Sequence, residues 1–213
     1  MKAIFKDLFS NWKTVPNLLS FLRIIMVPIF AVLFNNGQYL GAVGILALSG
    51  LSDFFDGKIA RRFNQISSLG KILDPIADKL TQITIAIMFY LTFARAQDEL
   101  IRKFSFVFLI FLIKEALMVV GGAILIAMGI KPGAAEMPGK VATFAFYLIM
   151  ISIIGFGPEI GIISNAFNLG TYPPVVMVAL ICISAVLCIV AFCSYLPATF
   201  RQVRQKKTEP DMP

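Results

Sequence analysis

The chain has 213 residues, of which 58% are hydrophobic and only 15% are charged, and its formal net charge is +7. This balance lies well outside the composition of soluble domains and predicts an integral membrane protein. The basic residues are spread over short loops rather than gathered on one polar surface. Attraction to anionic lipid headgroups therefore explains the charge, and we expect no nucleic-acid partner.

Apolar stretches of roughly twenty residues are long enough to cross a bilayer as helices. The sequence supplies six of them, at 17–34, 39–61, 72–94, 104–130, 141–161 and 174–196. The last is the clearest, because no charged residue lies between Val175 and Tyr195, and the fifth is the weakest, because Pro158 and nearby glycines blur its end. We expect an all-α fold, an integral membrane bundle of six transmembrane helices that forms one domain over 1–213.

The distribution of lysine and arginine predicts the orientation of this bundle. Residues 1–13 mix lysines with Phe, Leu and Trp, which is typical of a short interfacial helix, with a frayed tail as the alternative. Basic residues also gather in the loops near 58–71 and 131–140 and in the tail 201–213, whereas the opposite loops hold only Arg95, Arg102 and Lys103. The positive-inside rule then places both termini on the cytoplasmic side of the cell membrane.

Four aspartates stand in the apolar sequence between the second and third predicted spans. They form the motifs Asp53-x-x-Asp56-Gly57-x-x-Ala60-Arg61 and Gly70-x-x-x-Asp74-x-x-x-Asp78. A charged carboxylate at the centre of a membrane helix costs about 2.5–3.5 kcal/mol on insertion scales, so the group needs something that offsets this cost. Residues three and four apart share a helix face, so an antiparallel helix pair would bring the four carboxylates into one pocket that opens to the cytoplasm.

Divalent cations are the ligands that such a pocket would suit. Carboxylate oxygens favour Mg²⁺ or Mn²⁺, and zinc is disfavoured because the chain has no histidine and no cysteine near the cluster. Two cations flanked by these carboxylates could bridge a pyrophosphate. Gly57 and Gly70 would let a ligand approach the backbone, and Arg61 could pair with a phosphate through its planar fork.

Two other interpretations of the aspartates stay open. Carboxylates can pair with basic neighbours at a membrane interface, and the candidates are Lys58, Arg61, Arg62, Lys71 and Lys79. Intramembrane acids also mark ion and metal transporters. Against a transport pathway, the acids concentrate near one face, and the remaining spans hold only Lys114 and Glu115 well inside.

At every defining position, the string from Asp53 to Asp78 resembles the signature of the CDP-alcohol phosphatidyltransferases, which join a CDP-linked lipid to an alcohol and release CMP. The resemblance covers about the first ninety residues and extends to two further strings that look like the phosphatidylglycerophosphate synthase branch. These strings are Pro16-Asn17-Leu18-Leu19-Ser20 with Arg23 and Pro28, and Leu73-Asp74-Pro75-Ile76-Ala77-Asp78-Lys79.

The resemblance implies a role for each motif residue. Asp53, Asp56 and Asp74 would hold the metal centre, with Asp78 also near it, and Asp78 would take the proton from the acceptor hydroxyl. The residues that would line the CDP site are Asp53, Gly57, Ala60, Arg61 and Gly70. The implied donor is CDP-diacylglycerol, and the implied assembly is a homodimer.

The acceptor alcohol is predicted to be glycerol 3-phosphate, which gives phosphatidylglycerophosphate and CMP. A small anionic acceptor needs cationic partners, and Lys114, Lys131 and Lys140 are the candidates for its phosphate.

One departure from the family pattern supports a different acceptor. Many phosphatidylglycerophosphate synthases carry Arg-Glu and a second arginine on the fourth helix, whereas this chain has Lys114-Glu115 followed by Gly121-Gly122, and Ala142 stands where another lysine is often found. The same string also looks like cardiolipin synthases of this family, which use phosphatidylglycerol, and this is the alternative prediction. A third possibility for Lys114 and Glu115 is a mutual ion pair that needs no substrate.

Overall fold

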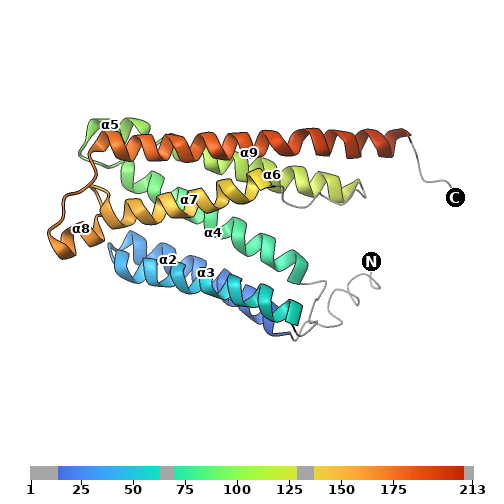
Figure 1. The fold of residues 1–213 in the computed structure, drawn as a ribbon, viewed down its shortest axis with the longest axis horizontal. Helices are drawn as coiled ribbons and strands as arrows, with labels where there is room; N and C mark the ends of the chain where they lie inside the picture. The colour runs from blue at the N-terminus through green and yellow to red at the C-terminus, as the bar shows by residue number, and fades with distance from the viewer. Residues whose placement is uncertain (1–13, 63–69, 129–136, 209–213) are drawn as a thin grey trace. The chain divides into compact units, whose positions relative to one another are not determined.

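The computed structural model describes residues 14–62, 70–128 and 137–208, apart from the side chains at helical positions 16, 53–62, 71–72, 74–75, 126–127, 198 and 205–208. Within these ranges all regular secondary structure is helical, which confirms the all-α prediction (Figure 1). In chain order the helices are α2 (Val15–Asn35), α3 (Tyr39–Arg62), α4 (Gly70–Phe93), α5 (Glu99–Phe104), α6 (Val107–Ala127), α7 (Met137–Phe156), α8 (Ile162–Phe167) and α9 (Pro174–Thr208). The predicted interfacial segment 1–13 lies outside the described residues.

Each of the six predicted spans coincides with a helix. Five segments of the described chain are long and apolar enough to cross a membrane: Asn17–Asn35, Ile76–Phe93, Glu99–Leu125, Met137–Phe156 and Pro174–Arg204. The remaining prediction, 39–61, corresponds to α3, whose described apolar part is Tyr39–Ser52. The chain is therefore a multi-pass helical membrane protein.

Side-chain caps explain where two of the helices begin. Thr14 caps α2, and its Oγ1 accepts a hydrogen bond from the Asn17 backbone N–H at 3.4 Å. Asp98 caps α5, and its Oδ1 accepts from the backbone N–H groups of Leu100 and Ile101 at 2.9 and 3.0 Å. Both caps satisfy donors that the first turn of a helix leaves without an intrahelical acceptor.

Two helix boundaries differ from the hydropathy prediction. Helix α7 covers Met137–Phe156 instead of 141–161, because the chain turns after it, with the Gly157 N–H donating to the Ile153 carbonyl at 2.7 Å and Gly161 at a positive φ of 42°. Helix α9 continues to Thr208, well past the expected end at 196. Its last turns are rich in Arg, Gln and Lys, which are good helix formers that hydropathy does not count.

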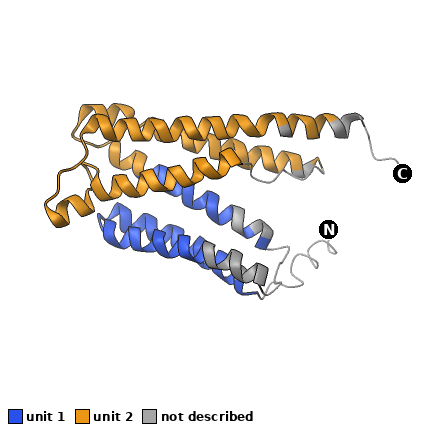
Figure 2. Ribbon diagram, in the orientation of Figure 1, with its two compact units in different colours: residues 1–88 blue, residues 89–213 orange. Residues whose placement is uncertain are grey.

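The structure comprises two compact units, residues 1–88 and 89–213 (Figure 2). In the first unit, α2 and α3 pack side by side. Phe30 and Phe34 of α2 are buried in its core, with their ring centroids 5.5 Å apart. The prediction of one domain over 1–213 stays a prediction.

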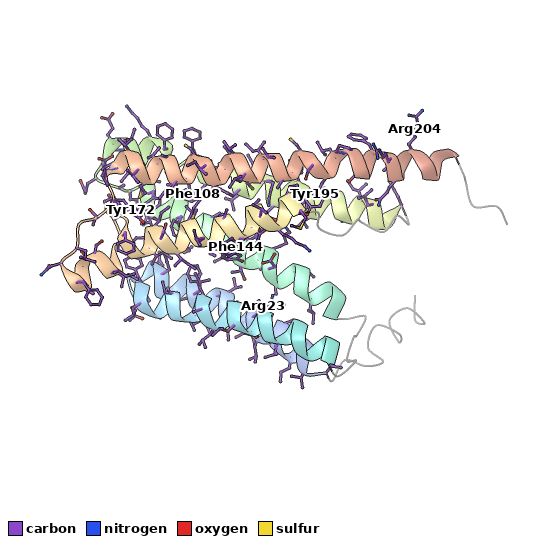
Figure 3. The ribbon with its side chains drawn as sticks, viewed as in Figure 1. Arg23, Phe108, Phe144, Tyr172, Tyr195 and Arg204 are labelled. Atoms are coloured by element: carbon purple, nitrogen blue, oxygen red, sulfur yellow. The ribbon has the colours of Figure 1, made fainter. Side chains whose placement is uncertain are left out.

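The second unit is built around α9, which packs against α5, α6 and α7. Phe108, labelled in Figure 3, is fully buried, and its ring centroid lies 5.6 Å from that of Phe89 and 5.7 Å from that of Phe93. Aromatic pairs of this kind contribute about 0.5–1.5 kcal/mol each beyond the area that they bury.

A close approach joins α7 to α9 in the same unit. A Cβ added to Gly139 near the start of α7 would lie 3.2 Å from Cε2 of Tyr195 and closer still to its hydroxyl. A larger residue at this position would therefore force the Tyr195 side chain to shift.

Candidate functional site

The four aspartates fall on two helices of the first unit. Asp53 and Asp56 belong to the last turns of α3, and Asp74 and Asp78 belong to the first turns of α4. This helical placement agrees with the one expected from the sequence. The side chains of Asp53, Asp56 and Asp74 lie outside the described part of the structure, whereas the side chain of Asp78 lies within it.

The other residues predicted for a CDP site belong to the same two helix ends. Gly57, Ala60 and Arg61 lie in the last two turns of α3, where side chains are not described, and Gly70 is the first residue of α4 and is buried. Their predicted roles stay predictions.

The carboxylate of Asp78 is hydrogen-bonded within its own helix. Gln82, one turn further along α4, donates from Nε2 to Oδ2 of Asp78 at 3.2 Å. Gln82 is only 6% exposed, and so is its neighbour Thr81, whose hydroxyl instead donates to the Ala77 carbonyl at 2.9 Å. The two buried polar residues therefore differ in their acceptor, which is Asp78 for one and the helix backbone for the other.

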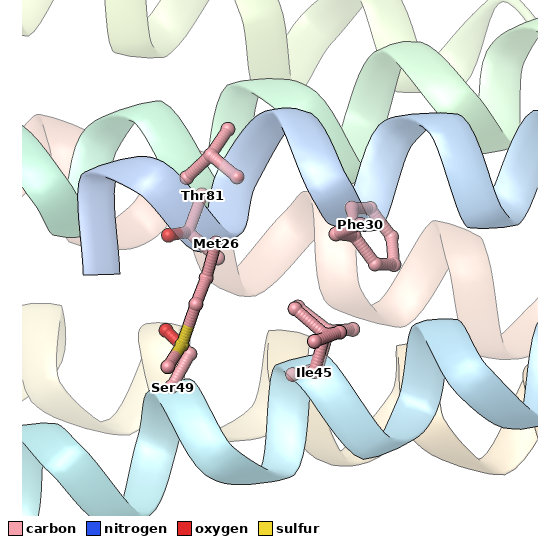
Figure 4. Close-up of a pocket in the computed structure, with 7 residues that line it drawn as sticks. Met26, Phe30, Ile45, Ser49 and Thr81 are labelled. Carbon is pink, nitrogen blue, oxygen red and sulfur yellow. The ribbon is translucent and has the colours of Figure 1, made fainter. Parts of the chain in front are cut away.

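A small cavity lies between α2, α3 and α4 (Figure 4). Its lining residues are Met26, Val27, Phe30, Ile45, Leu46, Ser49 and Thr81. The space open to a water centre is about 10 Å³, close to the minimum that one water requires. Ser49 precedes Asp53 by one turn and Thr81 follows Asp78 by nearly one turn, so these aspartate positions lie about 5 Å along their helices from the cavity.

Buried polar side chains are frequent at this part of the first unit. Those with exposure between 0 and 6% are Asn17, Ser20, Arg23, Ser49, Thr81 and Gln82. Figure 3 labels Arg23 on α2. Polar side chains inside membrane proteins either form hydrogen bonds that hold helices together or belong to functional sites. Of these residues Gln82 contacts Asp78, and sequence reasoning missed it, although it stands one turn from that aspartate, and that spacing was the available signal.

The three lysines proposed for an acceptor phosphate lie in different settings. Lys114 of α6 forms an ion pair with the adjacent Glu115, whose side chain is 3% exposed. The mutual ion pair considered from the sequence is therefore confirmed. Lys140 is exposed in the first turn of α7, and Lys131 lies outside the described residues.

The chemistry of the aspartate donors fits a hard divalent cation. Carboxylate oxygens are the ligands that Mg²⁺ and Mn²⁺ prefer in proteins. Within 14–62, 70–128 and 137–208, no group of three or more His, Cys, Asp or Glu side chains gathers among those described, and that set leaves out Asp53, Asp56 and Asp74. The metal centre stays a prediction that rests on the donor set.

Together these features define a multi-pass helical membrane protein with a carboxylate motif divided between two consecutive helices. The model of the CDP-alcohol phosphatidyltransferase family matches residues 13–190, and the chain belongs to this family of enzymes. The resemblance noted in the motif is thereby confirmed, and it extends well beyond the first ninety residues.

Relatives with two different names are similar to the chain. A CMP-forming cardiolipin synthase of Streptomyces coelicolor is 40% identical over 149 residues, which are 65% of this chain and 66% of that protein. A CDP-diacylglycerol–glycerol-3-phosphate 3-phosphatidyltransferase of Aquifex aeolicus is 32% identical over 139 residues, 65% of this chain and 74% of that protein. A human CMP-forming cardiolipin synthase is 45% identical over 75 residues, 35% of this chain and 25% of that protein. The chain thus spans just under two thirds of the first relative, and the names support the family without fixing the acceptor.

Proposed function

We propose that this protein transfers the phosphatidyl group of CDP-diacylglycerol to a hydroxyl of a glycerol-containing acceptor and releases CMP. The observation that carries the proposal is the carboxylate motif on consecutive helices of a chain that belongs to this family. The acyl chains of the donor would stay in the bilayer while its nucleotide reaches the helix ends from the cytoplasm.

In the proposed reaction, a carboxylate oxygen of Asp78 takes the proton of the acceptor hydroxyl. The hydroxyl oxygen forms a bond to the phosphatidyl phosphorus, and the bond from that phosphorus to the bridging pyrophosphate oxygen breaks. CMP leaves with the bridging oxygen, and Asp78 returns its proton to water. The reaction needs no oxidant and no second nucleotide.

We propose that Asp53, Asp56, Asp74 and Asp78 hold Mg²⁺ or Mn²⁺, with two ions as the expected number. Such ions would supply positive charge that offsets the negative charge developing on the departing phosphate. Asp53→Asn should therefore weaken Mn²⁺ binding, measured by electron paramagnetic resonance of the purified protein. Unchanged Mn²⁺ affinity would remove Asp53 from the metal site.

The nucleotide would be held mainly by the end of α3. Gly57 and Ala60 have small side chains that leave room for CDP, and Arg61 can pair with its phosphates through a planar, bidentate fork. Gly70 at the start of α4 would complete the CDP site.

Phosphatidylglycerol is the acceptor that we favour, which makes the product cardiolipin. Two observations support it: Lys114 already pairs with Glu115 in the structure, and the Streptomyces cardiolipin synthase is more similar to the chain than the Aquifex enzyme over alignments of comparable length. Glycerol 3-phosphate, the acceptor expected from the sequence, is the second candidate. The exposed Lys140 and the similarity to the Aquifex enzyme support it.

A single assay tests the reaction and the acceptor. Purified protein in lipid with CDP-diacylglycerol and Mg²⁺ should release CMP when phosphatidylglycerol is added. Release with glycerol 3-phosphate alone would reverse the acceptor assignment. No release with either acceptor, in Mg²⁺ and in Mn²⁺, would contradict the proposed transfer, and metal flux into sealed liposomes without CDP-lipid would point to a transporter.

We further propose a homodimer in the cell membrane with both termini and the aspartates on the cytoplasmic side. The asymmetry of basic residues between alternate loops supports the orientation. Cross-linking in native membranes tests the dimer, and reporters fused to each terminus test the orientation.

A further inference from the structure

A buried amide contacts the aspartate that is proposed as the base. Gln82 donates from Nε2 to Oδ2 of Asp78 at 3.2 Å across one turn of α4. We infer that Gln82 is a positioning residue that holds the Asp78 carboxylate in the orientation needed to take the acceptor proton. This inference rests on the function proposed above and adds a residue that the aspartate motif does not contain.

Burial of Gln82 restricts its hydrogen bond to Asp78 to one geometry. Gln82 is 6% exposed, in a helix whose following turns are almost wholly apolar. A buried amide without a hydrogen-bond partner destabilises a fold, so the bond to Asp78 favours one arrangement of both side chains. The terminal torsion of an aspartate otherwise has a broad distribution, and a donor fixed on one oxygen narrows it.

The chemistry of an amide suits this task. Glutamine donates a hydrogen bond while staying neutral, so it can orient a carboxylate without adding a charge that repels a cation or pairs with a phosphate. Misplacing a reacting group by about 1 Å can cost on the order of 10²-fold in rate, so the orientation of Asp78 should matter for turnover.

Thr81 provides a matched control on the same helix. It is as deeply buried as Gln82, at 6%, but its hydroxyl donates to the Ala77 carbonyl and not to Asp78. Thr81→Val removes a buried hydrogen bond of similar depth while leaving the contact between Gln82 and Asp78 in place.

The experiment compares Gln82→Met, Gln82→Glu and Thr81→Val in the full-length protein. Methionine keeps the length of the side chain without a donor, and glutamate keeps its shape while replacing the neutral donor by a negatively charged acceptor. Because partners of ligating and reacting groups typically contribute about 10–100-fold to activity or metal affinity, kcat for CMP release should fall by that factor in both Gln82 variants. The KM for CDP-diacylglycerol should change by less than about twofold, because the substrate contacts are kept.

A Mn²⁺ titration without lipid substrate gives a readout that does not depend on turnover. Gln82→Met should bind Mn²⁺ about tenfold more weakly, and Thr81→Val should bind it like the wild type. Should Gln82→Met fail to fold, the kcat of Gln82→Glu carries the test, because glutamate preserves the size of the side chain and removes the donor.

Three results would overturn the inference: wild-type kcat and Mn²⁺ affinity in a folded Gln82 variant, an equal loss in Thr81→Val, or a rise in KM with kcat unchanged. Failure of the proposed function is a separate result. In that case the wild-type protein itself releases no CMP, and the Mn²⁺ titration still tests whether Gln82 acts on Asp78.

Discussion

Replacing Lys114 by methionine tests whether the ion pair on α6 serves the fold or the acceptor. Methionine keeps the unbranched apolar stem and removes the ammonium that pairs with Glu115. The Glu115 side chain is only 3% exposed, so the variant would leave a buried carboxylate without its ion-pair partner and with little access to water.

The structure allows the effect to be estimated. Breaking a buried ion pair by removing one partner destabilises a protein by about 3–5 kcal/mol. Because Lys114 is itself 17% exposed, we take the lower end, about 3 kcal/mol, which corresponds to a fall in Tm of about 6–12 °C for a chain of this length. The surface pair Lys103–Glu99, 2.7 Å long with both side chains 68% exposed, is the control, and Lys103→Met should cost less than about 1 kcal/mol.

Thermal unfolding of the purified variants and CMP release with each acceptor decide between the two roles. The double variant Lys114→Met/Glu115→Gln should regain much of the lost Tm, because it removes both charges, and the KM for phosphatidylglycerol should stay unchanged. The reasoning is refuted if Lys114→Met unfolds like the wild type while the KM for glycerol 3-phosphate rises and does not recover in the double variant. Lys114 would then bind the acceptor phosphate.

Three further outcomes are expected. Asp78→Asn should abolish CMP release, while binding of CDP-diacylglycerol, measured by calorimetry, should persist. Full turnover by this variant would contradict the assignment of Asp78 as the base. Phe108→Ala, at a fully buried ring, should lower the free energy of unfolding by about 3–5 kcal/mol. Phe144→Ala, at a ring that is 69% exposed, should change it by less than about 0.5 kcal/mol. Gly139→Ala should destabilise the protein by about 1–3 kcal/mol, because its methyl group would meet the Tyr195 ring of α9. Gly121→Ala is the control, because nothing lies within 4 Å of a Cβ added there. Equal Tm values for these two alanine variants would contradict the packing argument.

Hydropathy located the membrane helices closely, because the bilayer imposes both their length and their composition. The second span, expected at 39–61, is observed at Tyr39–Arg62. The same criterion placed the end of the last helix at 196, whereas α9 continues to Thr208. Hydropathy reports where a chain meets lipid, and it carries no information on where a helix of polar residues ends.

The candidate site was predictable in its positions but not in its contacts. Spacing alone put Asp53 and Asp78 on consecutive helices. The bond from Gln82 to Asp78 depends on the rotamers of both side chains, which a sequence does not specify. The Lys114–Glu115 pair was only one of several possibilities, because adjacent residues of a helix do not face each other and pair only when their side chains bend together.

The length of α9 makes its C-terminal end a suitable attachment point for a reporter of membrane topology. Its 35 residues extend over about 52 Å, whereas the hydrocarbon layer of a bilayer is about 30 Å thick. The last part of α9, from Pro197 to Thr208, carries Arg201 and Arg204, the latter labelled in Figure 3, and it continues the helix for about 18 Å past the expected end of the apolar stretch at 196. A fluorescent domain fused after Thr208 would be held clear of the lipid surface, and it would report the side of the membrane without shortening any span.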